Sequence, residues 1–193
     1  MKIKIFGLGA IGSNLFVQLV KQFPDYGYTG IDFDKVEDRN IRTQAYFREM
    51  VGQPKTKALM MLGMRYVKKL NYEPLTMRVD DKTVLFGHSS ELWIDCFDNS
   101  KSRTYLKNFK GQPNLLHLGF SPLYSAECLW DAHYDVPNDV DPQQGDICSM
   151  IDAVGFIQMF VGLAMMTISE WVRSGIKRDF IVTHKNKLTW LDK

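Results

Sequence analysis

Two stretches near the amino terminus carry residues suited to chemistry on a nucleotide. Residues 7–12 read GLGAIG, and residues 31–44 read IDFDKVEDRNIRTQ. A nicotinamide dehydrogenase needs one carboxylate after its second strand, to bind a ribose. The second stretch offers four carboxylates, two arginines and the amides Asn40 and Gln44. The two uses that fit this pattern are binding of a dinucleotide and holding of ATP for chemistry at a phosphate.

The glycine-rich stretch has the spacing of a phosphate-binding turn between a strand and a helix. Gly7 permits the tight turn, Gly9 lets a phosphate approach the backbone, and Gly12 lets the helix pack closely on the sheet. The helix that begins beside Ala10 offers free N–H groups and a partial positive charge. The motif is weak alone, but its place directly after the first strand favours a nucleotide loop over a turn without ligand.

Asp32 and Lys55 help to separate the two uses. Asp32 ends the second expected strand, where a dinucleotide fold carries its ribose-binding acid. Lys55 stands in VGQPKTKAL near a helix start, where a cation does not help the helix dipole. An anion held at the same place, such as the phosphates of a nucleotide, explains this position. The alternative is a solvated surface lysine, which is common.

Alternating strands and helices must position these residues. Such alternation predicts an α/β fold with a doubly wound, mostly parallel sheet, formed by one domain over residues 1–193. The expected strands are residues 2–6, 28–32, 91–95, 114–120, 125–130, 180–184 and 187–191. The expected helices are residues 11–22, 54–70, 100–109 and an apolar run at 154–168.

The composition is that of a soluble globular protein. The 193 residues are 45% hydrophobic and 24% charged, which is ordinary for such proteins. A net charge of +2 gives no strong field, so neither nucleic acid nor a membrane is an expected partner. Three cysteines without framework spacing and no visible targeting signal favour a reducing cytoplasm. The apolar run is shorter than the ~20 residues of a membrane span and predicts a buried core or interface helix.

Several short segments follow one another in a fixed order, and their residues are Gly7, Gly9, Gly12, Asp32, Asp34, Val36, Asn40, Gln44, Gly52, Lys55, Asp95, Asp98, Asn99 and Arg103. In this order they resemble the ThiF/MoeB/E1 superfamily of enzymes that activate ubiquitin-like and sulfur-carrier proteins. The family pattern runs from a glycine loop through D-x-D-x-V and N-L-x-R-Q to G-x-x-K and C-T-D-N. The resemblance covers nearly the whole chain and implies a Rossmann-like adenylation fold.

The resemblance implies a specific reaction. The C-terminal carboxylate of a carrier protein attacks the α-phosphate of ATP, giving an acyl adenylate and pyrophosphate. Such catalysis is mainly positioning and neutralisation of developing charge. The nucleotide site implied in this way has Asp32 on the ribose hydroxyls with Asp34 nearby, and Asn40, Gln44 and Lys55 on the phosphates.

Asp98 is the metal ligand that the resemblance implies, with Asn99 beside it. Mg²⁺ is a hard cation that favours carboxylate and phosphate oxygens. The alternative role for Asp98 is the N-cap of the helix that DNSKSR opens. The resemblance further implies a ubiquitin-like or sulfur-carrier partner with a Gly-Gly type C-terminus, and a homodimer.

The segment after Asn40 departs from the family pattern. Thr43 stands where the family has arginine, and Arg42 lies one position earlier. Such a shift can point a side chain elsewhere, so Arg42 or Arg39 substitutes for that arginine, or the phosphate clamp is weaker. The printed sequence also opens on the first strand, whereas family members often carry a leading helix that reaches a partner subunit's ATP.

Cys148, in GDICSMIDAVGF, is the best candidate for covalent chemistry. In resembling proteins a cysteine in this region can form a thioester or an acyl disulfide with the carrier. A thiolate near a helix N-terminus would be stabilised, although Asp146 and Asp152 oppose that. The alternative is a partly buried structural thiol. Cys96 and Cys128 are expected to be small core residues.

Three functional hypotheses stay open on the sequence. The first is an E1-like adenylating enzyme that uses Mg²⁺ and ATP. The second is a nicotinamide-dependent oxidoreductase, which explains the glycines and Asp32 but not Lys55 or Asp98. The third is a non-catalytic subunit of the same fold that binds nucleotide or carrier, and Thr43 favours it.

Overall fold

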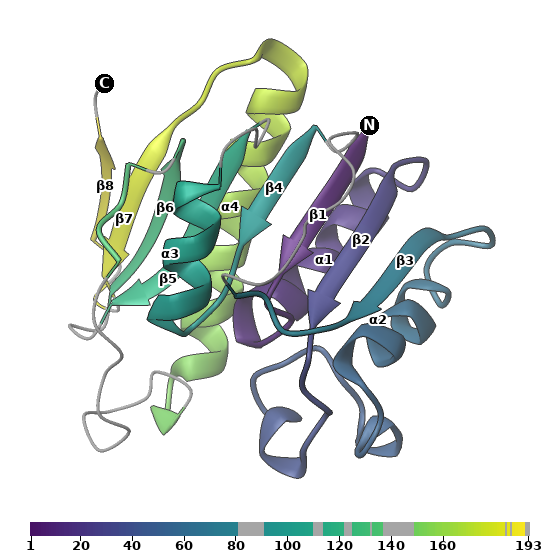
Figure 1. The fold of residues 1–193 in the computed structure, drawn as a ribbon. Helices are drawn as coiled ribbons and strands as arrows, with labels where there is room; N and C mark the ends of the chain where they lie inside the picture. The colour runs from purple at the N-terminus through teal and green to yellow at the C-terminus, as the bar shows by residue number, and fades with distance from the viewer. Residues whose placement is uncertain are drawn as a thin grey trace.

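The computed structural model is built on one β-sheet. It describes residues 1–80, 91–109, 114–121, 125–131, 133–136, 149–183, 185 and 187–191. In this part of the chain the sheet has eight strands in the order β3-β2-β1-β4-β5-β6-β7-β8 (Figure 1). They are β1 (Lys2–Phe6), β2 (Gly27–Asp32), β3 (Asn71–Thr76), β4 (Leu92–Asp95), β5 (Leu115–Ser121), β6 (Ser125–Trp130), β7 (Asp179–Thr183) and β8 (Leu188–Leu191).

The strand directions confirm the predicted fold class. β3, β2, β1, β4 and β5 pair in parallel, and β6, β7 and β8 extend the sheet in antiparallel fashion. The chain runs from β1 outward to β3 on one side and from β4 outward on the other, so the strand order reverses between β1 and β4. In open α/β sheets, ligands bind beyond the carboxyl ends of the strands at such a reversal.

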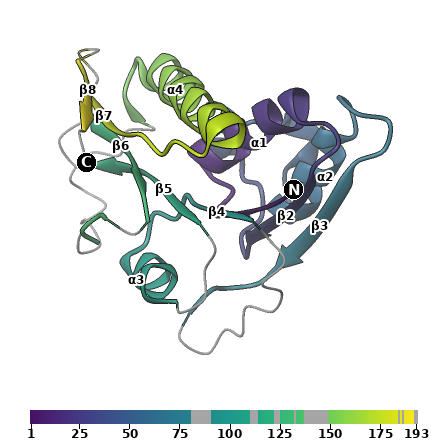
Figure 2. The same ribbon diagram turned by 90° about the horizontal axis from the view of Figure 1, so that it is seen from above.

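Helices cover both faces of the sheet. Seen from above, α1, α2 and α4 lie on one face and α3 lies on the other (Figure 2). Two short 3-10 turns, η1 (Asp38–Asn40) and η2 (Arg48–Met50), belong to the crossover between β2 and α2. The helices are α1 (Ala10–Gln22), α2 (Lys55–Gly63), α3 (Ser100–Asn108) and α4 (Ala153–Ser174).

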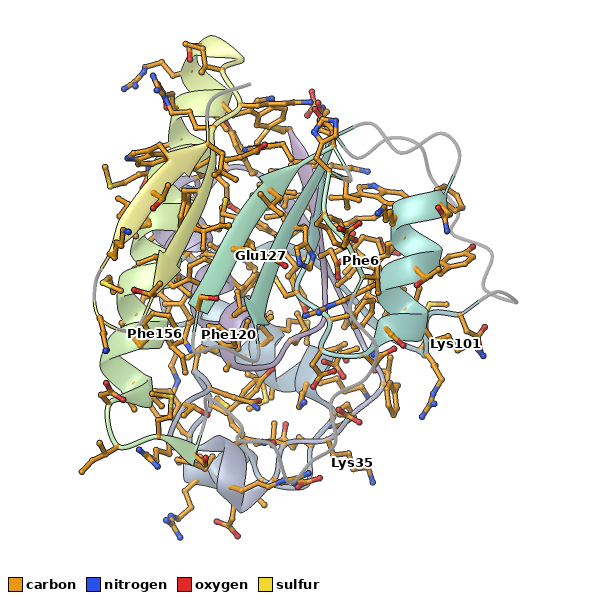
Figure 3. The ribbon with its side chains drawn as sticks, turned by 90° about the vertical axis from the view of Figure 1, so that its left-hand side faces the viewer. Phe6, Lys35, Lys101, Phe120, Glu127 and Phe156 are labelled. Atoms are coloured by element: carbon orange, nitrogen blue, oxygen red, sulfur yellow. The ribbon has the colours of Figure 1, made fainter. Side chains whose placement is uncertain are left out.

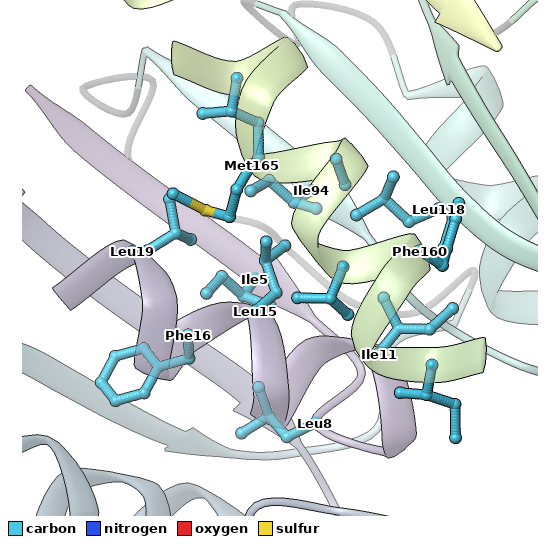
Figure 4. Packing of buried hydrophobic residues seen from close by; sticks show 14 of the residues in the cluster. Ile5, Leu8, Ile11, Leu15, Phe16, Leu19, Ile94, Leu118, Phe160 and Met165 are labelled. Carbon is cyan, nitrogen blue, oxygen red and sulfur yellow. The ribbon is translucent and has the colours of Figure 1, made fainter. Parts of the chain in front are cut away.

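The core is divided by the sheet. On one face, Ile5 of β1, Leu15 of α1 and Phe160 of α4 pack together without exposed area (Figure 4). On the other face, Phe6 and Trp93 pack near α3 with ring centroids 5.2 Å apart. Neighbouring residues of a strand point to opposite faces, so Ile5 and Phe6 anchor β1 in both clusters. This anchorage fixes the start of the glycine loop.

Helix α4 is longer than the sequence analysis predicts. It has 22 residues, because residues 169–174, four polar and two apolar, continue the helix beyond the apolar run. Gly175, at a φ of +73°, ends it. It is the one described helix long and apolar enough to cross a membrane, and half of its apolar window is buried. The short length of the apolar run argued against a membrane span in the sequence analysis, and that argument was wrong. α4 packs on α1 and on the sheet (Figure 4).

Two other elements differ from expectation. β3 is unexpected because Glu73 and Pro74 are poor strand residues, but β3 lies at the edge of the described sheet, where proline is tolerated. α2 ends at Gly63 rather than near residue 70. A Cβ on Gly63 would lie 2.8 Å from the side chain of Leu70 and 3.0 Å from that of Phe16. The following chain therefore packs directly against the end of the helix.

Candidate active site

Two loops meet where the strand order reverses. Gly7 follows β1 and residues 96–99 follow β4, and the two strands pair with Phe6 opposite Asp95. The amide of Cys96 donates a hydrogen bond to the carbonyl of Phe6 at 2.7 Å. The glycine loop and the segment that carries Asp98 therefore start side by side at the carboxyl ends of β1 and β4.

The glycine loop has the tight form that its spacing predicts. Gly7 has a φ of +84°, and a Cβ there would lie 2.7 Å from the carbonyl oxygen of Cys96. A Cβ on Gly12 would lie 2.0 Å from the carbonyl oxygen of Gly7. A Cβ on Gly9 would meet nothing within 4 Å, so the loop is open there. Because α1 begins at Ala10 without a side-chain cap, its first N–H groups suit an anion.

We expect Gly7→Ala to destabilise the protein more than Gly175→Ala. Both glycines have positive φ, which costs an alanine about 1–2 kcal/mol. A Cβ at Gly175 meets nothing within 4 Å, whereas a Cβ at Gly7 meets backbone at 2.7 Å, and such overpacking adds about 1–3 kcal/mol. Urea unfolding of both variants measures the difference. Equal losses of unfolding free energy would contradict the close contact between the two loops.

Asp32 ties the glycine loop to the end of β2. Its Oδ2 accepts the amide of Leu8 at 2.7 Å, and its Oδ1 accepts the amide of Asp34 at 2.8 Å. Burial raises the pKa of this carboxyl, against the lowering influence of Lys55 and of the two amides. Carboxylate oxygens have further lone pairs, so Asp32 can hold the loop and still accept a ribose hydroxyl.

Lys55 is a buried cation beside these acids. Its Nζ lies 3.2 Å from Asp34 Oδ2, and its amide donates to the carbonyl of Asp34 at 2.9 Å. Lys55 is 7% exposed, so the alternative of a solvated surface lysine is wrong. Lys55 is the first residue of α2. The helix was expected to begin at Pro54, which is instead its N-cap. The bridge between Lys35 and Pro54 holds this helix start against the chain after β2.

Asn40 and Gln44 lie on the crossover that follows. The Oδ1 of Asn40 accepts the amide of Glu37 at 2.8 Å and so caps η1. The Oε1 of Gln44 is buried and has no hydrogen-bond partner in the described part of the chain. A buried polar atom without a partner is costly. Gln44 therefore fits a site that a polar ligand completes, and the phosphate roles of both amides stay predictions.

Arg42 and Thr43 point in different directions. Arg42 is exposed, and its guanidinium donates to the backbone carbonyls of Met150 and Ile151, ahead of α4. Thr43 is 6% exposed, and its carbonyl accepts the Nδ2 of Asn14 at 2.9 Å. The one-residue shift thus places arginine on the segment before α4 instead of the buried position. Arg42 as the phosphate clamp stays a prediction.

Some residues that support the site have no recognisable sequence signal. The hydroxyl of Tyr46 donates to the carbonyl of Leu8 at 2.8 Å, and Ser13 Oγ accepts the amide of Ala45 at 3.0 Å. The first contact fastens the crossover to the glycine loop, and the second fastens it to the first turn of α1. A third, between Gln158 Nε2 and Asn14 Oδ1 at 2.8 Å, joins α4 to α1, and here the polar residue within an apolar run was the available signal.

The segment after β4 separates two roles that the sequence left open. Asn99 is the N-cap of α3, since its Oδ1 accepts the amide of Ser102 at 2.9 Å. The alternative that Asp98 caps this helix is therefore wrong. Asp98 is exposed, and no partner is recorded for it in the described ranges. Its carboxylate is available to a ligand at the loop edge.

The carboxylate of Asp98 suits a metal that a substrate helps to bind. The described residues contain no group of three or more His, Cys, Asp or Glu side chains that could hold a metal ion. Mg²⁺ is commonly bound by one or two carboxylates together with substrate phosphates and water. One carboxylate beside a predicted phosphate loop fits that mode, and the Mg²⁺ role stays a prediction.

The described cysteines suit structural roles. Cys128 is buried and Cys96 is partly buried, and burial raises the pKa of both thiols. A raised pKa lowers the share of nucleophilic thiolate. Cys148, the candidate for covalent chemistry, lies outside the described residues.

Comparison with known proteins agrees with this architecture. The model of the ThiF family matches residues 1–179. No curated protein sequence matches the chain at a significant level. Among solved structures, E. coli MccB with ATP has a TM-score of 0.74 at 14% identity, covering 99% of this chain and 63% of that one. PaaA has a TM-score of 0.68 at 17% identity, with the same coverage of 99% and 63%.

The structural matches and the family match support different conclusions. Identities of 14% and 17% show a shared fold, and the chain spans less than two thirds of the length of either protein. The family match extends through the glycine loop, the acidic strand end, the buried lysine and Asp98, in that order. By this match the chain belongs to the ThiF family.

Proposed function

We propose that the chain is an ATP-dependent adenylyltransferase that activates the C-terminal carboxylate of a small protein. The observation that carries the proposal is the buried Lys55, paired with Asp34 at 3.2 Å next to Asp32 and the glycine loop. A nicotinamide site needs the acid for its ribose, whereas an additional buried cation favours a ligand with more phosphate charge. Phosphates of ATP supply the anion that such a cation attracts.

The molecules bound in related solved structures support the proposal. E. coli MccB, described as a microcin C7 biosynthetic enzyme, has been solved with ATP and with MccA. For this chain we propose that ATP and a polypeptide carboxylate are the two substrates. The partner is a ubiquitin-like or sulfur-carrier protein with a Gly-Gly type C-terminus.

The proposed mechanism assigns the chain's own residues to positioning and charge. Asp32 orients the ribose, while the N–H groups after Gly9 and the ammonium of Lys55 bind the phosphates. A carboxylate oxygen of the partner attacks the α-phosphorus, the bond to the bridging oxygen breaks, and pyrophosphate leaves. Asp98 would hold Mg²⁺ in part, and the metal would supply neutralisation of phosphate charge when bound. Such preorganised charge is the main source of acceleration in phosphate chemistry.

A second candidate function has one observation in its favour. Thr43 is buried and Arg42 contacts the carbonyls of Met150 and Ile151, so the position of the family's arginine carries no charge and the neighbouring arginine is turned to the segment before α4. A non-catalytic subunit that binds nucleotide is compatible with this arrangement. ATP–pyrophosphate exchange by the purified protein with candidate carriers separates the two functions, because only the enzyme catalyses it.

We expect calorimetric titration to show binding of ATP with Mg²⁺ and no binding of NADH. The reason is that Lys55 and Asp98 meet a triphosphate and its metal, and neither helps to bind a nicotinamide. The control is Asp32→Leu, which removes the ribose-binding acid and should weaken binding of any ribonucleotide. Tight NADH binding without an ATP signal would refute the adenylation proposal and favour the oxidoreductase.

A further inference from the structure

A buried polar cluster lies beneath the segment that carries Asp98. Asp95 and His117 have no exposed side-chain area and occupy paired positions on the parallel strands β4 and β5. His117 Nδ1 lies 3.0 Å from Asp95 Oδ2, and its Nε2 lies 3.3 Å from Glu127 Oε1. The hydroxyl of Tyr134 donates to Asp95 Oδ2 at 2.9 Å, and its ring stacks on the imidazole.

The cluster occupies the α3 side of the sheet. Figure 3 shows Glu127 on that side, whereas Phe120 and Phe156 lie between the sheet and α4. Burial opposes a charge on His117, but hydrogen bonds to Asp95 and Glu127 outweigh it and raise the pKa of the imidazole. With both ring nitrogens facing carboxylate oxygens, the protonated form satisfies both contacts. Arg103 is also buried, and its positive charge opposes the rise in the pKa of His117.

Asp95 connects this cluster to the backbone of Phe97. Its Oδ1 accepts the amide of Phe97 at 3.0 Å, and Arg103 Nε donates to the carbonyl of Phe97 at 2.6 Å. Both polar backbone groups of the residue before Asp98 are therefore held by buried charged side chains. The same peptide touches the glycine loop, because a Cβ on Gly7 would lie 3.0 Å from the Phe97 nitrogen.

Gly119 leaves the space that the cluster occupies. A Cβ at this position of β5 would lie 2.6 Å from His117 Nε2 and 3.3 Å from Arg103 Nη2. The first distance is shorter than side-chain packing allows, so a larger residue would displace the imidazole. The strand thus combines a histidine with a glycine two residues later to place the ring between its two carboxylates.

We propose that His117 is a positioning residue, which holds Asp95 and thereby fixes the Phe97 backbone so that Asp98 is presented to the metal and phosphates. The inference rests on the proposed function for the role of Asp98. It assigns His117 no contact with nucleotide, metal or carboxylate substrate. The effect of His117 is transmitted through Asp95 to one peptide segment.

Amide hydrogen exchange at Phe97, measured by NMR, reports the hold on this segment directly. His117→Ala removes both imidazole contacts, and exchange at Phe97 is expected to become about tenfold faster or more, as for loss of a charge-assisted hydrogen bond. His117→Asn keeps an N–H near the position of Nδ1 and is expected to restore most of the protection. Affinity for ATP with Mg²⁺ should fall in His117→Ala and recover in His117→Asn, with a smaller change for ATP alone.

A pair of tyrosine variants provides a milder test with a matched control. Tyr134 and Tyr28 are both 2% exposed, but the hydroxyl of Tyr28 bonds to the carbonyls of Leu19 and Phe23, on the other face of the sheet. Tyr134→Phe should speed exchange at Phe97 and weaken Mg²⁺-dependent ATP binding, whereas Tyr28→Phe should do neither. Unchanged exchange in Tyr134→Phe, or an equal change in Tyr28→Phe, overturns the proposal even if His117→Ala fails to fold.

The two readouts distinguish failure of this proposal from failure of the proposed function. A wild-type protein that binds no ATP with Mg²⁺ refutes the adenylation function, while the exchange rate at Phe97 still decides whether the cluster holds the segment. Faster exchange with unchanged Mg²⁺-dependent binding shows that Asp98 does not need this hold, and also overturns the proposal.

Discussion

Asp98→Asn should reduce ATP–pyrophosphate exchange by a factor of about 10²–10³, corresponding to about 3–4 kcal/mol of transition-state stabilisation. Asp98 lies beside the glycine loop at the reversal of strand order, and its carboxylate is exposed. Mg²⁺ prefers charged carboxylate oxygens, so an amide of the same shape binds it poorly. The loss should appear both in turnover and in Mg²⁺-dependent affinity for ATP, because the carboxylate is proposed to hold the metal in the ground state as well as in the transition state.

The fold should be insensitive to this substitution. No partner of Asp98 is recorded in the described ranges, and Asn99 provides the cap of α3, so the urea unfolding free energy should change by less than about 0.5 kcal/mol. The matched control is Asp25→Asn. Asp25 is an exposed aspartate just before β2, so it lies at the amino-terminal end of this strand, whereas Asp98 follows the carboxyl end of β4. Near-normal exchange by Asp98→Asn, or a loss of similar size in Asp25→Asn, would show that Asp98 binds no metal in the reaction.

The parts of the site that follow strand ends could be predicted from sequence. Gly7, Gly12 and Asp32 occupy positions set by the first strand, the helix after it and the next strand, and each follows from local spacing. A glycine with positive φ and no room for a Cβ leaves a sequence trace, because no other residue fits. The mostly parallel sheet follows in the same way from the alternation of elements.

The orientation of the crossover could not be predicted from its residue types. Arg42 and Thr43 are neighbours, and which of them is buried depends on contacts with Asn14 and the segment before α4. β3 was missed for a related reason, since an edge strand has one neighbour and little apolar requirement, so Glu73 and Pro74 obscure its pattern. In both cases tertiary context outweighs local preference.

The buried charged cluster depends on long-range pairing alone. Asp95, His117 and Glu127 meet because β4, β5 and β6 are adjacent in a particular register. Their spacing along the chain matches no local motif, and a shift of one residue in a strand would turn the side chain to the other face. Only the three-dimensional register indicates that His117 lies between two carboxylates.

Lys55→Met should reduce exchange by about 10²-fold or more, because a buried cation beside transferring phosphates stabilises the charge that develops there. Lys55 is 7% exposed, and methionine preserves most of its volume. Its partner Asp34 has a side chain that is 48% exposed, so water can solvate the carboxylate once the ammonium is lost. The activity loss should therefore exceed any loss of stability.

Lys57 provides the matched control for this substitution. It lies two residues further along α2 and is exposed, so Lys57→Met changes the net charge equally without altering the site. A similar loss in both variants would attribute the effect to overall charge and refute the assignment of Lys55. Lys55→Arg should also be poor, because the larger planar guanidinium does not fit the place of a compact ammonium. The kinetic constants of Lys55→Met identify the step at which Lys55 acts. A raised KM with normal kcat means that Lys55 binds the phosphates equally in the ground state and the transition state. An equal fall in kcat and kcat/KM means that it acts only in the transition state.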